Sequence, residues 1–141
     1  MTNKILDAIS QALNSEFGDS YELYSENIKQ DFKEPCFFIM CLNPSEQNFL
    51  GNRYYRKYLF NIQYFPKNKK SPNSELYEMQ ERLFNCMEYI NMGNDLIRGK
   101  NRRGEIENKT LHFFVNYDVF VVKKGTEEDY MGDLKTNIKT K

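Results

Sequence analysis

The side chains that could carry out chemistry in this sequence are few and scattered. The single histidine, His112, precedes two phenylalanines in an apolar run. No serine or cysteine stands in a nucleophile motif that could use it as a base. Glycine-rich phosphate loops and the His-Glu-x-x-His zinc motif are also missing from the sequence. A lone histidine at the start of a strand is usually a structural or exposed residue.

Asp118 and the three cysteines give no stronger signal. Asp118 lies among apolar strand residues without a second carboxylate at a defined spacing, so a solvated or hydrogen-bonded residue is favoured over an acid catalyst. Cys36, Cys41 and Cys86 are odd in number and lack the C-x-x-C spacing of a zinc site. We therefore expect no catalytic residue, no cofactor and no metal, and an enzyme is the least favoured class.

A basic group in the second half of the chain is the strongest charged signal. Arg98, Lys100 and Arg102 alternate along the sequence, which predicts that they project from one strand face, with Arg103 beside them. The glycines that interrupt this strand predict a bend or bulge. Together with the aromatic and basic stretch 53–58, the group could form a nucleic-acid surface. The favoured interpretation is a solvent-exposed hairpin whose charges prevent edge pairing.

The longest period-2 alternation in the chain lies in the stretch Arg53–Pro66. Aromatic and apolar residues share one face from Tyr58 onward, and the proline ends the strand. The first half is rich in arginine, lysine and tyrosine, which indicates a strand that begins in solvent or against a partner and ends in the core. Phe49 and Leu50 lie in the polar connection just before it. The default expectation is that they tuck back onto the core, and the alternative is that they are presented to a partner.

Length and charge place the chain in a broad class. Its 141 residues suit one globular domain with a single core. The 20 basic and 20 acidic residues cancel, so no overall field points to nucleic acid or to a membrane. Neither a signal peptide nor an apolar window of membrane-spanning length is found. The chain is expected in a reducing cytosol.

The apolar periodicity predicts an α+β fold in the order α-β-β-β-α-β-β. The first helix runs to about Glu16, and the second, with an acidic outer surface, from about Ser74 to Asn91. Strands are expected at about 21–25, 36–43, 53–65, 96–107 and 110–123. Pro44-Ser45 is expected to end the second strand, and Asn108-Lys109 to form a hairpin turn.

The expected architecture is a mostly antiparallel sheet with both helices packed on one face, because two helices with one apolar stripe each need a sheet face to cover. Residues 1–124 are expected to form this single domain. Residues 125–141 are expected to be a polar and flexible C-terminal tail.

Several collinear stretches resemble the tail terminator family of Bacillus- and Clostridium-type phages and defective prophages. They extend from about Asn3 to Val122 and include EFGDSYELYSENIKQDFKEPCFFI, LNPS, FLGNRYYRKYLFNIQYFP, MQERLFNCMEYI, DLIRG and LHFFVNYDVFV. The resemblance implies a small structural protein of the virion tail, assembled in the cytoplasm of the bacterial host without membrane contact.

Members of such a family assemble as a ring, usually a hexamer, on the head-proximal end of the tail tube. The resemblance implies that the ring stops tube polymerisation and presents a surface to head-completion proteins. In contractile tails the ring also touches the sheath protein. DNA passes through its lumen without sequence-specific binding.

A ring of identical subunits needs two different patches on each subunit. Exposed aromatic and basic residues outside the helical stripes are the candidates, since tyrosine and arginine are common interface anchors. The candidate subunit or tube interface consists of Phe49, Leu50, Arg53, Tyr54, Tyr55 and Arg56. The candidate lumen or partner-facing basic hairpin consists of Arg98, Lys100, Arg102 and Arg103. The alternative functions are another neck or tail-completion adaptor and, less favoured, a nucleic-acid-binding module.

Overall fold

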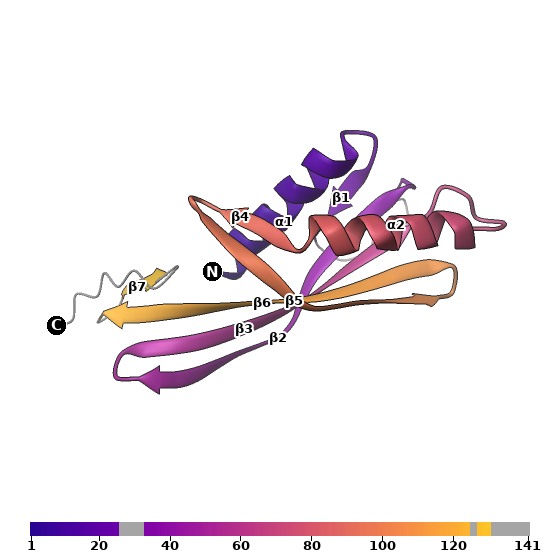
Figure 1. Cartoon of the computed structure of the whole chain (residues 1–141). Helices are drawn as coiled ribbons and strands as arrows, with labels where there is room; N and C mark the ends of the chain where they lie inside the picture. The colour runs from indigo at the N-terminus through magenta and orange to yellow at the C-terminus, as the bar shows by residue number, and fades with distance from the viewer. Residues whose placement is uncertain (26–32, 125–126, 131–141) are drawn as a thin grey trace.

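The computed structural model describes residues 1–25, 33–124 and 127–130, which form two helices on one side of a twisted sheet (Figure 1). The elements are α1 (Thr2–Phe17), β1 (Glu22–Tyr24), β2 (Cys36–Leu50), β3 (Arg53–Phe65), α2 (Asn73–Cys86), β4 (Tyr89–Met92), β5 (Asp95–Glu107), β6 (Thr110–Lys124) and β7 (Glu127–Tyr130). The strand order is β1-β2-β3-β6-β5-β4, with β7 on β6, and only β1 and β2 pair in parallel. The predicted fold class and helix placement are confirmed, and β4 and β7 are additional.

The core lies between the helices and the sheet face beneath them, called here the helix-side face. Strand alternation brings every second residue of β3 and β6 to this face, as the sequence predicts. The buried residues of these strands are Tyr58, Phe60, Ile62, Tyr64, Leu111, Phe113, Val115, Tyr117 and Val119. The helices contribute Ile5, Ala8, Ile9, Leu13, Phe17, Leu76, Met79 and Leu83. Full burial of such side chains contributes roughly 1.5–3 kcal/mol each, so this layer dominates stability.

The second helix ends earlier than its periodicity predicts. It stops at Cys86, and residues 89–92 form β4, in which Ile90 lies opposite Ile97 of β5. The predicted end at Asn91 is therefore wrong. Ile90 continues the helical spacing of the apolar stripe, but strand pairing buries the same side chain. A short apolar segment satisfies both periods, and the β4–β5 pairing decides between them.

The predicted strand end at Pro44-Ser45 is also wrong, because β2 continues to Leu50. A register shift between Leu42 and Ser45 absorbs the proline, which has no N–H to donate. Proline is tolerated there because β1 covers the outer edge of β2 only at Cys36–Phe38. The segment predicted as a polar connection is thus the end of a hairpin arm, which projects beyond the helices (Figure 1).

Two tight turns close the long hairpins. Gly51, at φ 60°, leads the two-residue turn between β2 and β3. Asn108 and Lys109, at φ 53° and 62°, form the predicted turn between β5 and β6. Positive φ at the first central residue of one turn, and at both central residues of the other, gives the twist that antiparallel strands favour. Both turns therefore fix the register of the strands that carry the exposed residues discussed below.

The predicted C-terminal tail is described only in part. Residues 125–126 and 131–141 lie outside the described residues, whereas Glu127–Tyr130 pairs with the end of β6 as β7. No helix within 1–25, 33–124 and 127–130 combines the length and apolar character needed to cross a membrane.

Candidate interaction surfaces

The six predicted interface residues do not form one patch, because alternation along β3 divides them. Alternate residues of a strand share a face, and Tyr58 is buried on the helix-side face. Arg56 and Tyr54 therefore belong to that face as well. Arg53 and Tyr55 belong to the opposite face, called here the open face because neither helix covers it (Figure 1). The structure therefore places two separate surfaces at the end of the β2–β3 arm.

An aromatic cluster lies on the open face where β2, β3 and β6 meet. Phe120 of β6 lies opposite Tyr55 in register, with ring centroids 4.7 Å apart, and 5.3 Å from the ring of Phe49. Phe49 is 58% exposed and Leu50 is 62% exposed, so neither tucks onto the core. We call Phe49, Leu50, Tyr55 and Phe120 the aromatic tip. A groove of about 390 Å³ beside it is also lined by Gln47, Asn48 and Lys100.

Phe120 is the residue of this surface that sequence reasoning missed. Its neighbours in β6 are valines that enter the core or its edge, so the sequence places Phe120 inside an apolar run. Its position in the alternation could have identified it. The buried face of β6 carries the odd-numbered residues 113 to 121, so an even-numbered residue such as Phe120 points to the other face. A large aromatic residue on the other face indicates either a second core or a contact surface.

Asp118 holds the aromatic tip in position. Its Oδ2 accepts a hydrogen bond of 2.8 Å from the Tyr55 hydroxyl and lies 3.7 Å from Nζ of Lys100. Burial, together with the neighbouring Asp118 carboxylate, raises the pKa of Tyr55 to about 12, so the phenol stays protonated and donating. Asp118 is therefore a hydrogen-bonded strand residue, which is the interpretation that the sequence favours over an acid catalyst.

On the helix-side face of the same arm, Glu46 joins three strands. Its carboxylate accepts from Arg56 at 2.7 Å and from Lys123 at 2.8 Å. These two hydrogen bonds lower the pKa of Glu46. The Lys123 ammonium also lies 4.3 Å from the ring centre of Tyr54. Exposed ion pairs contribute little stability singly, so this group mainly orders side chains at the surface.

A bulge in β5 divides the predicted basic group. Lys100 lies opposite Asn116 and Arg103 opposite Phe114, so two residues of β5 face one of β6 between these pairs. Asn101 has φ 52° at this bulge. The extra residue turns Arg102 to the helix-side face and places Arg103 on the open face, with its guanidinium 4.5 Å from the Phe114 ring centre.

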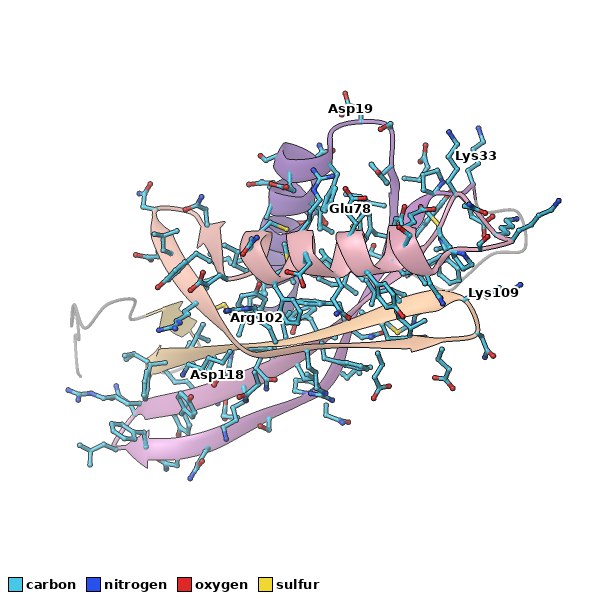
Figure 2. The ribbon with its side chains drawn as sticks, turned by 45° about the vertical axis from the view of Figure 1, so that its right-hand side comes forward. Asp19, Lys33, Glu78, Arg102, Lys109 and Asp118 are labelled. Carbon is cyan, nitrogen blue, oxygen red and sulfur yellow. The ribbon has the colours of Figure 1, made fainter. Side chains whose placement is uncertain are left out.

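The prediction that Arg98, Lys100 and Arg102 share one face is therefore wrong. Arg102 lies on the side of α2, whereas Asp118 lies on the other side of the sheet (Figure 2). Alternation holds only while the strand has no extra residue, and the bulge adds one. Arg103 takes the place on the open face that the sequence assigns to Arg102.

His112 and the cysteines are the side chains that sequence analysis weighed for chemistry. His112 lies between Gln63 of β3 and Glu105 of β5 in register. Burial raises the pKa of Cys36 and of Cys86 to about 12, which keeps both as unreactive thiols at neutral pH. No group of three histidine, cysteine or acidic side chains within the described ranges could hold a metal ion.

A family model described as phage tail terminator protein matches residues 4–129. No curated protein matches the sequence. One solved structure, without a functional description, has a TM-score of 0.43 and 13% sequence identity, covering 90% of this chain and 99% of the other.

Proposed function

Because the chain belongs to the phage tail terminator family, we propose that it forms a ring on the head-proximal end of the tail tube. There it stops tube polymerisation and provides the surface that joins the head. The single observation that carries this proposal is the family match over residues 4–129 of the chain. The family is one of structural tail proteins, and the absence of a catalytic arrangement among the described residues is compatible with it.

The aromatic tip suits a contact between subunits or with the tube protein. Phe49 and Leu50 are more than half exposed at the end of a projecting arm, where a partner can cover them without rearranging the core. Burial of the part of these two side chains that is still exposed would contribute roughly 2–4 kcal/mol. The Tyr55–Asp118 hydrogen bond holds the surface in one geometry before binding, which lowers the ordering cost.

A ring requires a heterologous contact, in which one patch meets a different patch on the next copy. The arm offers the aromatic tip on the open face, and the side chains of Tyr54 and Arg56 on the helix-side face. These two surfaces of one arm could contact two different neighbours, such as an adjacent subunit and the tube protein. A hexamer is the expected ring.

The cations of β5 suit a different role from the aromatic tip. Arg98, Lys100 and Arg103 are exposed, and face either the lumen or a head-side partner. In a lumen they would attract the DNA backbone without reading bases. The remaining proposed partners are the head-completion or neck protein and, in a contractile tail, the sheath protein. The location follows as the virion tail, assembled in the host cytoplasm.

Deleting the gene from its phage or prophage and imaging the tails tests the proposal. Tails of uncontrolled length without attached heads would support a terminator. Tails of normal length that fail to join heads would contradict it and identify a neck adaptor. Intact, infectious particles would overturn both roles and favour a protein that binds DNA without a part in assembly.

A further inference from the structure

Two basic side chains flank the aromatic tip on the open face. Arg53 and Lys57 alternate with Tyr55 along β3, so all three project from the same side of the sheet. The Lys57 ammonium lies 5.8 Å from the ring centre of Tyr55. Asp118 beneath the tip is engaged by Tyr55 and Lys100, and neither Arg53 nor Lys57 forms an ion pair in the described part of the chain. The tip is thus an exposed apolar centre beside two positive charges.

The outer side of α2 carries the opposite charge. Helical spacing brings five exposed residues onto one line, called here the acidic stripe: Ser74, Tyr77, Glu78, Glu81 and Asn85. Tyr77 is 56% exposed, and the stripe contains no lysine or arginine. Glu78 and Glu81 form no ion pair with any residue that the structure describes. The stripe therefore presents an exposed aromatic ring beside two carboxylates.

The aromatic tip and the acidic stripe lie on opposite sides of the sheet. The tip is on the arm that projects beyond the helices, whereas α2 covers the helix-side face (Figure 1). Figure 2 shows Glu78 on α2 and Asp118, which holds the tip, across the sheet from it. One copy cannot bring its own two surfaces together, so a contact between them must join different copies. Each copy then keeps its second surface for the next one.

We propose that the aromatic tip of one copy docks on the acidic stripe of α2 in the next copy. The apolar residues of the tip cover the ring of Tyr77, and the two cations beside the tip face the two carboxylates of the stripe. Complementary charges around such a contact steer association and fix its orientation. The inference rests on the proposed ring and specifies the two patches of its heterologous contact.

Charge favours this unlike contact over the two like contacts. Two tips facing each other would bring Arg53 and Lys57 of both copies together, and two stripes would bring four carboxylates together. Like charges placed against each other at an interface are strongly unfavourable. Opposite charges meet only when a tip faces a stripe. A head-to-tail contact, which can close a ring, is therefore favoured over a twofold dimer of either surface.

Mixing two variants of the full chain, each lacking one surface, tests the inference in solution. The tip variant carries Phe49→Ser and Leu50→Ser and keeps the stripe. The stripe variant carries Glu78→Lys and Glu81→Lys and keeps the tip. In sedimentation velocity we expect each variant alone to be monomeric, and the mixture to form a dimer and nothing larger, because only one kind of contact remains intact. No dimer in the mixture at the highest soluble concentration would overturn the inference, as would self-association of either variant equal to that of the unaltered protein.

A charge-matched control separates the acidic stripe from net charge. The control variant, Glu105→Lys with Glu107→Lys, makes the same change at two exposed positions of β5 that belong to neither surface. It should self-associate as the unaltered protein does, whereas the stripe variant should lose about tenfold or more in affinity. Equal weakening in both variants would contradict the proposed contact. Tail length after deletion of the gene reports separately on the terminator role, so either idea can fail alone.

Discussion

The hydroxyl of Tyr55 donates a hydrogen bond of 2.8 Å to Oδ2 of Asp118, across the boundary between β3 and β6. The two residues are 63 positions apart in the sequence. The bond holds the Tyr55 ring against Phe120 and thereby forms the floor of the aromatic tip. A partner thus meets a surface whose geometry is already set.

Removing this hydroxyl should cost stability. Tyr55→Phe leaves the Asp118 carboxylate with Lys100 at 3.7 Å as its remaining neighbour, so we expect a loss of about 1 kcal/mol in the free energy of unfolding. Urea denaturation followed by circular dichroism measures the change. Tyr54→Phe on the helix-side face is the matched control and should be neutral. Equal losses in both variants would contradict the role assigned to the hydrogen bond.

The tip should matter for assembly rather than for folding. Phe49→Ser changes a side chain that is 58% exposed, so the free energy of unfolding should move by no more than about 0.5 kcal/mol. Ring formation, or binding to tail tubes, should be lost, as sedimentation and electron microscopy would show. Tyr89→Ser, at an exposed position on β4, is the control for a large surface residue. Normal assembly of both Phe49→Ser and Tyr55→Ala would remove the tip from the proposed interface.

Gly99 should be the least replaceable glycine of the sheet. A Cβ at this position would lie 2.4 Å from the Met87 carbonyl oxygen and 2.8 Å from Cγ2 of Val115. The same carbonyl accepts a hydrogen bond of 2.7 Å from the Tyr117 hydroxyl, so it has little freedom to move. We expect Gly99→Ala to lower the free energy of unfolding by about 2 kcal/mol or more.

Gly104→Ala provides the comparison for that change. Its new Cβ would meet the side chain of Gln80, whose flexible end can move aside, so the loss should be clearly smaller. Thermal unfolding of both variants measures the difference. A Gly104→Ala loss equal to that of Gly99→Ala would show that rigid contact with the Met87 backbone is not the cause.

Stability in acid should depend on Glu75 at the start of α2. Burial alone would raise the pKa of Glu75. The Tyr64 hydroxyl at 2.5 Å and the amides of Lys67 and Asn68 at 2.9 and 3.0 Å outweigh burial and lower the pKa. A lowered pKa in the folded state contributes stability above the unfolded pKa, and this contribution is lost as pH falls through the folded value.

Glu75→Gln should therefore be less stable than the unaltered protein at neutral pH, and the difference should shrink at pH values below about 4. Urea midpoints measured across the acid range test this. Glu78→Gln, an exposed neighbour on α2, should show no such pH-dependent difference. A Glu75→Gln difference that stays constant with pH would contradict the charge-dependent hydrogen bonding.

The sequence by itself determined the layers of this protein. The alternation of β3 and β6 assigned Tyr58, Phe60 and Phe113 to a buried face, and the stripes of α1 and α2 required that face for cover. The Asn108-Lys109 turn followed from local chemistry in the same way. These features depend on neighbours along the chain, which periodicity reports directly.

Tertiary structure decided the surfaces. Phe49, Tyr55 and Phe120 come from three strands, and only the register of those strands brings them together. Arg102 and Arg103 exchange faces because one extra residue in β5 reverses every side chain beyond it. Strand register and bulges are set by pairing between distant segments, so a sequence pattern can identify exposed aromatic and basic residues but not the face that each one joins.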